Sequence, residues 1–251
     1  MSGILLLGSP HHAAELAAAI APAQPLFLWN DGFSPEDSTS IHERLVLVES
    51  TSQLPKQLSA IIELSCVDDG QKHSNLGFIS QIAGPDTLVL SNTLTMTATA
   101  AASLIGGNSP VVGLSFLPGT FASASLVEVA FSLQVDASLR EGVLANVRQL
   151  FAREVEVVAD GIGLVSARVL AMVINEAAFA MMEGVASPAD IDTAMKLGTN
   201  YLDGPLAWCD RIGPDVVLAI LEALWQEYRE ERYRPCVLLR QLARANKPFH
   251  N

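Results

Sequence analysis

The sequence predicts an α/β domain built on a mostly parallel sheet, followed by an all-α domain. In the first part of the chain, short continuous apolar runs alternate with turns, which suits strands that are buried on both faces. From about residue 160 onward, apolar residues recur every three or four positions, which is the period of an amphipathic helix. We therefore predict one domain over residues 1–159 and a second over residues 160–251.

The first domain contains eight apolar runs that we predict to be strands. They are Gly3–Leu7, Pro25–Trp29, Leu45–Val48, Ala60–Leu64, Thr87–Leu90, Pro110–Phe116, Leu126–Phe131 and Glu154–Val158. The Ala-rich segment Ala13–Ala21 favours a helix between the first two. The spacing of these runs fits repeated βα units and hence a parallel sheet.

The second domain contains several predicted helices with recognisable ends. The first covers Leu164–Glu183 and ends at a glycine. The next begins with Ser187 as N-cap and Pro188 at its first position, and we expect it to stop at Gly198. Two more are predicted further on, at Pro214–Arg229 and Cys236–Ala245.

Composition excludes several classes of protein. Of 251 residues, 50% are hydrophobic and 17% are charged, which excludes extensive disorder. The net charge of −12 argues against nucleic acid as a partner. No apolar stretch is long enough to predict a membrane span, and the N-terminus lacks the basic region of a signal peptide, so we expect a cytoplasmic protein. The three cysteines are far apart and predict neither a metal site nor a disulfide framework.

The first predicted strand runs directly into Gly8 and a helix, as in a Rossmann-like dinucleotide-binding unit. In the G-x-G-x-x-G pattern, Gly8 holds the first glycine position, Pro10 the second and Ala13 the third. Pro10 is the main departure, because it removes an N–H donor and fixes φ. Because the strand, Gly8 and the helix still fit the pattern, we predict NAD as a possible cofactor. The alternative is that the loop has diverged from the pattern and binds little nucleotide.

Two further features belong to the predicted cofactor site. Asp31 lies about 20 residues beyond the glycine, where an acidic residue holds the ribose, and Asn30 fits the same position. His11 and His12 would lie at the start of the helix, either in contact with phosphate or simply solvated.

Longer segments carry a resemblance to a known family. Residues 175–213, including DGPLAWCDRIG at 203–213, and residues 231–242 resemble the helical domain of L-3-hydroxyacyl-CoA dehydrogenases. Ser91-Asn92-Thr93 resembles that family's S-N-T-S. The segments Gly113–Phe116 and Leu126–Val129 resemble its G-x-H-F and L-V-E-V.

The resemblance implies an NAD-binding Rossmann-like domain and a helical domain that forms homodimers. It also implies oxidation of the 3-hydroxyl of an acyl-CoA thioester, with a His–Glu pair performing the proton chemistry. The position of the His falls on Ser115 and that of the carboxylate on Glu128, and these are the predicted catalytic residues. The predicted substrate-binding residues follow the fifth strand: Ser91, Asn92 and Thr93.

Several departures from the family concern its chemistry. A serine hydroxyl cannot serve as a base at neutral pH. The family's positioning Ser and Asn fall on Leu94 and Ala167, so one catalytic position of four keeps its residue. Residues 32–43 stand where the family has a long helical hairpin that helps to hold the CoA thioester. Glu63, Asp68 and Lys72 are similar only in part to an acidic segment of the family.

Two hypotheses follow. The chain is an NAD(P)-dependent dehydrogenase in which another group, such as His73 or Thr95, replaces the missing base. Alternatively, it is a catalytically inactive, dehydrogenase-like dimer that binds a small molecule or acyl-CoA or serves as a scaffold. Substrate identity and chain length stay open.

Overall fold

The computed structural model describes residues 2–21, 24–30, 32–33, 42–107 and 109–250. The chain forms two compact units. The first comprises residues 1–116 and 121–164, and the second comprises residues 117–120 and 165–251. The sequence places the boundary after residue 159, a few residues before the point at which the chain enters the second unit.

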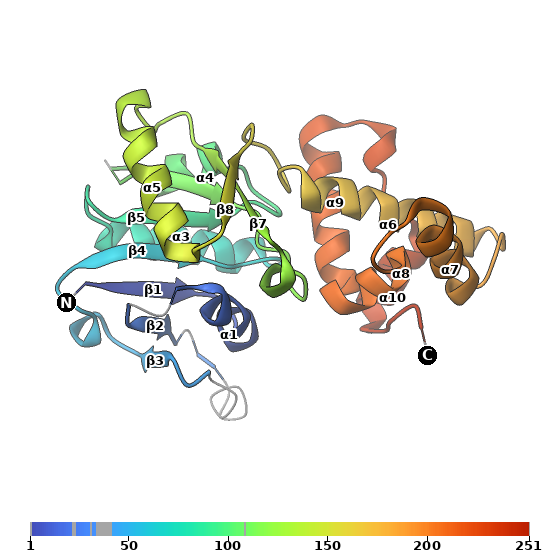
Figure 1. Ribbon diagram of the computed structural model, residues 1–251, viewed down its shortest axis with the longest axis horizontal. Helices are drawn as coiled ribbons and strands as arrows, with labels where there is room; N and C mark the ends of the chain where they lie inside the picture. The colour runs from blue at the N-terminus through green and yellow to red at the C-terminus, as the bar shows by residue number, and fades with distance from the viewer. Residues whose placement is uncertain (1, 22–23, 31, 34–41, 108, 251) are drawn as a thin grey trace. The chain divides into compact units, whose positions relative to one another are not determined.

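The first unit is built on one sheet of eight strands (Figure 1). In chain order the strands are β1 (Gly3–Leu7), β2 (Leu26–Trp29), β3 (Leu45–Val48), β4 (Leu58–Glu63), β5 (Leu88–Asn92), β6 (Val111–Leu114), β7 (Leu126–Phe131) and β8 (Glu154–Val157). Their order across the sheet is β3-β2-β1-β4-β5-β6-β7-β8, and all neighbours are parallel except β6 and β7. This confirms the predicted Rossmann-like, mostly parallel sheet.

The apolar runs form these strands because helices cover both faces of the sheet. The helices of this unit are α1 (Pro10–Ala19), α3 (Asp69–Ile82), α4 (Ala98–Ile105) and α5 (Arg140–Phe151). Leu5, Ile61 and Val89 form a core cluster with apolar residues of α3 and α4. The alternate positions Ile4 and Ile62 are fully buried as well. Continuous apolar sequence is what burial on both faces requires.

Side-chain caps fix the starts of these helices. The Ser9 hydroxyl accepts the backbone N–H of His12 at the start of α1. Asp160 accepts the N–H groups of Ala98 and Thr99, each at 2.8 Å, at the start of α4. A carboxylate at a helix N-terminus satisfies orphan donors and complements the helix dipole. Asp160, at the predicted domain boundary, therefore stabilises the start of helix α4 in the sheet unit.

The second unit is helical, as the sequence predicts. Its helices are α6 (Ser166–Met182), α7 (Pro188–Thr199), α8 (Pro205–Ile212), α9 (Pro214–Tyr228) and α10 (Val237–Ala245). Ser187 caps α7 as predicted. The predicted stop at Gly198 was wrong, because the helix continues to Thr199 and Asn200 takes up the left-handed conformation, with φ of 58°. None of the described helices has the length and apolar character needed to cross a membrane.

Two carboxylates, one buried and one partly exposed, connect segments of the second unit. Asp192 accepts the N–H groups of Leu206 and Ala207, each at 2.9 Å, at the start of α8. The Nδ1 atom of His250 lies 2.7 Å from Asp210, and its Nε2 atom lies 3.3 Å from Asp192. The C-terminal segment is thereby held against α7 and α8.

Candidate functional site

A pocket of about 310 Å³ opens at the carboxyl ends of β1 and β4. These adjacent strands lie where the strand order reverses direction, which is where open α/β sheets bind ligands. The pocket is lined by Leu7, Gly8, Ser9, His12, Trp29, Phe33, Leu64, Ser65, Cys66, Val67, Asp68, Gln71 and Asn75. Its wall is thus mainly apolar with a few polar groups, as in many small-molecule sites.

The turn from β1 into α1 forms one side of this pocket. Gly8 has φ of +153°, and a Cβ atom on it would lie 2.8 Å from Cβ of Leu64, so only glycine fits. Pro10 occupies the first helical position, where its fixed φ is favourable and the lost N–H has no partner within the helix. Its side chain is buried rather than in the pocket wall. Ala13 is fully buried beneath the turn. The departure at Pro10 removes one donor and leaves the pocket open.

Two residues, Asp31 and Asn30, are candidates for the predicted contact with the ribose. Asp31 lies outside the described residues. Asn30 has its side chain committed to protein: Oδ1 accepts the N–H groups of Gly32 and Phe33, and Nδ2 donates to Glu49 at 3.0 Å. Asn30 therefore shapes the turn after β2, and the role of ribose contact stays a prediction for Asp31.

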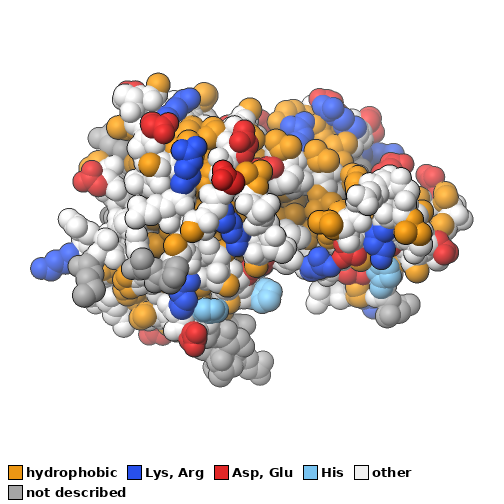
Figure 2. Space-filling model, viewed as in Figure 1, with side chains coloured by type: hydrophobic (Ala, Val, Ile, Leu, Met, Phe, Trp, Pro, Cys, Tyr) orange, Lys and Arg blue, Asp and Glu red, His pale blue; other side chains and the backbone are white. Residues whose placement is uncertain are grey.

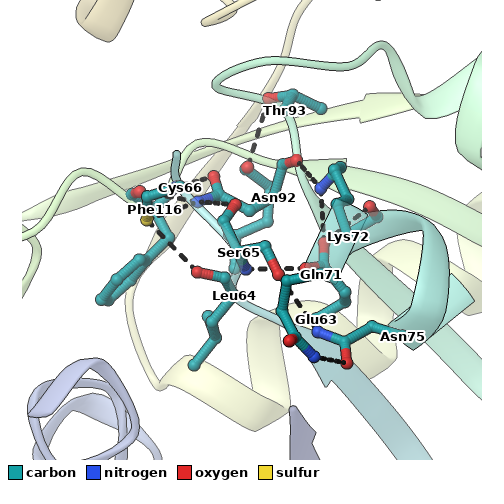
Figure 3. Close-up of polar contacts among 12 residues, drawn as sticks. Glu63, Leu64, Ser65, Cys66, Gln71, Lys72, Asn75, Asn92, Thr93 and Phe116 are labelled. Carbon is teal, nitrogen blue, oxygen red and sulfur yellow. Dashed lines mark hydrogen bonds and ion pairs between the residues drawn. The ribbon is translucent and has the colours of Figure 1, made fainter. Parts of the chain in front are cut away.

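A buried ion pair lies behind the pocket (Figure 3). Lys72 of α3 pairs with Glu63 at the end of β4, and both residues are fully buried. Lys72 Nζ also donates to the carbonyl oxygen of Asn92 at 2.6 Å, and the Ser91 hydroxyl donates to Glu63 at 3.3 Å. The pair therefore joins β4, α3 and β5. These contacts satisfy the charges, as burial requires.

The network reaches the pocket wall through uncharged side chains (Figure 3). The backbone N–H of Ser65 donates to Glu63 Oε1 at 2.7 Å. The Ser65 hydroxyl accepts from Asn75 at 3.1 Å, and Asn75 accepts from Gln71 at 3.0 Å. Ser65, Gln71 and Asn75 all line the pocket. A chain of hydrogen bonds thus connects the ion pair to the polar atoms of this wall.

The predicted substrate-binding segment holds strand ends together. Asn92 donates to the carbonyl of Phe116 and accepts its N–H, both at 3.1 Å. The Thr93 hydroxyl donates to Leu114 at 3.2 Å. Ser91, Asn92 and Thr93 are each no more than 1% exposed. Their side chains act on the site through the strands that they join, and direct contact with a ligand stays a prediction.

The structure brings the backbones of the two predicted catalytic residues together. Leu114, the last residue of β6, pairs with Val129 of β7, and Ser115 follows it next to Glu128. The Ser115 N–H donates to the Glu128 carbonyl at 3.3 Å. The Ser115 hydroxyl is buried and has no hydrogen-bond partner among the described residues.

The other positions expected to carry chemistry are apolar or engaged elsewhere. Leu94 and Ala167, which stand where the family has polar groups, are both fully buried. His73 is exposed on the second turn of α3, and its Nδ1 lies 2.7 Å from the Asp69 carbonyl oxygen. Thr95 is half-buried after β5. Within the described part of the chain, neither His73 nor Thr95 has a contact that identifies it as a base.

One pair in the pocket was missed by sequence reasoning. Cys66 follows β4, His12 lies on the first turn of α1, and Cys66 Sγ is 3.8 Å from His12 Nδ1. The His12 ring also makes an edge contact with Phe116, with the ring centroids 5.8 Å apart. The available signal was position: both residues follow buried parallel strands that we predicted, and the carboxyl ends of such strands share one edge of a sheet.

Comparison with known proteins identifies the relatives of this chain. A sequence model described as the C-terminal domain of 3-hydroxyacyl-CoA dehydrogenase matches residues 163–249. The chain is 34% identical to a probable 3-hydroxybutyryl-CoA dehydrogenase of Bacillus subtilis over 200 aligned residues. The alignment covers 80% of this chain and 69% of that relative. The chain belongs to the 3-hydroxyacyl-CoA dehydrogenase family. The resemblance stated from the sequence motifs is therefore confirmed.

Solved structures agree with this assignment at the level of fold. FadB2 of M. tuberculosis superimposes with a TM-score of 0.81 at 18% identity, covering 100% of this chain and 99% of that one. The (S)-3-hydroxybutyryl-CoA dehydrogenase of Ralstonia eutropha has a TM-score of 0.75 at 26% identity, covering 98% and 94%. The sheet and the helical unit of this 3-hydroxyacyl-CoA dehydrogenase family member thus have counterparts in both.

Proposed function

We propose that this member of the 3-hydroxyacyl-CoA dehydrogenase family binds NAD in the pocket at the ends of β1 and β4. The pocket carries this proposal: it lies at the switch point of the sheet, and its turn contains a glycine that admits no side chain. Gly8 and Ser9 would accommodate the pyrophosphate and Asp31 the ribose, while Pro10 and Ala13 shape and pack the turn. When bound, NAD supplies a hydride acceptor.

We further propose that the proton chemistry of the family reaction is reduced in this chain. Ser115, whose backbone N–H donates to the Glu128 carbonyl, takes the position of the family's base, and a hydroxyl there cannot accept the proton of a 3-hydroxyl group at neutral pH. A positioned general base contributes about 10²–10⁴ in rate. Oxidation of 3-hydroxyacyl-CoA should therefore be slower by about that factor than in a relative that keeps the base.

The second candidate is a binding or scaffold protein without turnover. The unpartnered, buried Ser115 hydroxyl favours it, since no described group activates that oxygen.

In either case we propose that residues 160–251 form a homodimer interface, which light scattering after gel filtration tests directly. Nucleic acid is not an expected partner: Figure 2 shows acidic and basic side chains interspersed, and the net charge is −12. The cytoplasmic location also stays a prediction.

Titration with NADH tests the proposal first. Trp29 lines the pocket, so bound NADH should quench tryptophan emission and gain emission by energy transfer. Reduction of acetoacetyl-CoA is then followed at saturating NADH. Binding without turnover supports the inactive protein, and binding with turnover supports the enzyme. Absence of any change in fluorescence would contradict the cofactor proposal.

Replacing Gly8 by alanine should weaken NADH binding by at least about tenfold and lower the free energy of unfolding by about 1–3 kcal/mol. The added Cβ would lie 2.8 Å from Leu64 Cβ, and alanine disfavours a φ of +153°. Gly77→Ala is the matched control, because Gly77 lies within α3 with open space around it. The free energy of unfolding of Gly77→Ala should rise by about 0.5–1 kcal/mol, and the variant should bind NADH as the parent does. Urea denaturation and NADH titration measure both effects.

A further inference from the structure

We infer that Cys66 is a modification site: its thiol, paired with the His12 imidazole, reacts with small disulfide-class compounds, and the added group then occupies the pocket. The inference about the thiol is independent of any ligand. Its consequence, that modification of Cys66 regulates cofactor binding, rests on the proposed function.

The Cys66 side chain lies in the pocket wall, where the Leu64 carbonyl and the Asn92 side chain contact its sulfur (Figure 3). Its sulfur donates to the Leu64 carbonyl at 3.2 Å, accepts from Asn92 Nδ2 at 3.3 Å and lies 3.8 Å from His12 Nδ1. In the thiol form the S–H group donates to the Leu64 carbonyl. When the proton moves to the imidazole, the Asn92 amide donor and the imidazolium would stabilise the thiolate. A thiol beside such positive groups is more reactive than one in apolar surroundings.

His12 is fixed in place to serve as that acceptor. Its backbone N–H is bound to the Ser9 hydroxyl at the start of α1, and its ring rests against Phe116. The side chain is half-buried and lines the same pocket as Cys66. The neighbouring His11, in contrast, is exposed and lies outside the pocket lining.

The reaction is a thiol–disulfide exchange. The proton of Cys66 moves from sulfur to His12 Nδ1, and the sulfur electron pair attacks one sulfur of the reagent. The reagent's S–S bond breaks as the new S–S bond to Cys66 forms. The departing sulfur leaves with the bonding electron pair and takes up the proton from His12. No further oxidant is required, since the reagent disulfide is the oxidant.

The other two cysteines provide internal controls. All three thiols are buried: Cys209 and Cys236 are fully buried in the helical unit, whereas Cys66 is 4% exposed and lies in the pocket wall. Burial raises the pKa of the Cys209 thiol well above its usual range, and Asp210 adds to the effect. Cys236 lies 3.8 Å from the sulfur of Met182. Among the three cysteines, which all lie in the described part of the chain, Cys66 is the one that lines the pocket.

Methyl methanethiosulfonate is a suitable probe, because its S–S bond is broken in the same way: the Cys66 sulfur takes the methylthio group, methanesulfinate leaves with the bonding electron pair, and the thiol proton passes from His12 to solvent. With the intact protein and intact-mass and peptide analysis, we expect Cys66 to be labelled at least about tenfold faster than Cys209 or Cys236, and dithiothreitol to reverse the label. His12→Gln should slow labelling by about tenfold, while His11→Gln should not. The Cys66→Ser variant should take up no fast label. Labelling of Cys66 no faster than that of Cys209, or an unchanged rate in His12→Gln, would overturn the inference.

NADH titration separates this inference from the proposed function. If the unmodified protein binds NADH, the methylthiolated protein should bind it at least about tenfold more weakly, because the added group occupies a pocket of about 310 Å³. Equal binding before and after labelling would overturn the regulatory consequence. If the unmodified protein does not bind NADH, the cofactor proposal fails, and the labelling rates alone decide whether Cys66 is the reactive thiol.

Discussion

Replacing Lys72 by methionine should lower the free energy of unfolding by about 3–5 kcal/mol, because it leaves the Glu63 carboxylate buried without its cation. Both side chains are almost completely removed from solvent, so water cannot replace the lost ammonium group. The Asn92 carbonyl and the Ser91 hydroxyl would lose order at the same time, since both belong to the same network. Urea denaturation followed by circular dichroism measures the change.

Two controls show whether the loss comes from the unpaired charge. Lys56→Met removes an exposed lysine and should change stability by less than about 0.5 kcal/mol. The double variant Glu63→Leu with Lys72→Met removes both charges and should regain most of the loss. If Lys72→Met were as stable as Lys56→Met, the ion pair would contribute nothing to the fold.

Restoring an imidazole at Ser115 should not by itself restore the family reaction. We expect Ser115→His to raise acetoacetyl-CoA reduction by less than about tenfold over the parent protein. Adding Leu94→Ser and Ala167→Asn should raise it by about 10²–10⁴, since positioned acid–base groups contribute that much. The physical reason is that a base is effective only when neighbouring groups hold both the base and the substrate in the orientation that the reaction requires.

The comparison requires that each variant remains folded and binds NADH. Leu94 is fully buried, so a serine there leaves a polar group in an apolar site, and thermal unfolding should be measured alongside turnover. Ser115→Ala is the control that removes the hydroxyl, and its rate of acetoacetyl-CoA reduction should equal that of the parent. Turnover by the parent protein at the rate of its relatives, lost in Ser115→Ala, would show that the serine replaces the base.

The strands and most helices of the second unit could be predicted from the sequence, because their signals are local. A continuous apolar run such as Gly3–Leu7 predicts a strand buried on both faces, and Ser187 followed by Pro188 predicts a helix start. The helix over Asp69–Ile82 could not be recognised in this way. Its buried face carries Lys72 and Asn75, whose polarity hides the apolar period.

The sequence by itself determined the fold class, the family and the substitution of a hydroxyl at the position of the base. These depend on which residue stands where along the chain. Tertiary structure alone decided that Lys72 meets Glu63, that Pro10 is buried beside an open pocket, and that Cys66 lies against His12. The two side-chain contacts join segments that are separated in sequence, and their distance in space cannot be read from that separation. The order of the parallel strands decides which carboxyl ends, and which of the residues that follow them, become neighbours at the edge of the sheet.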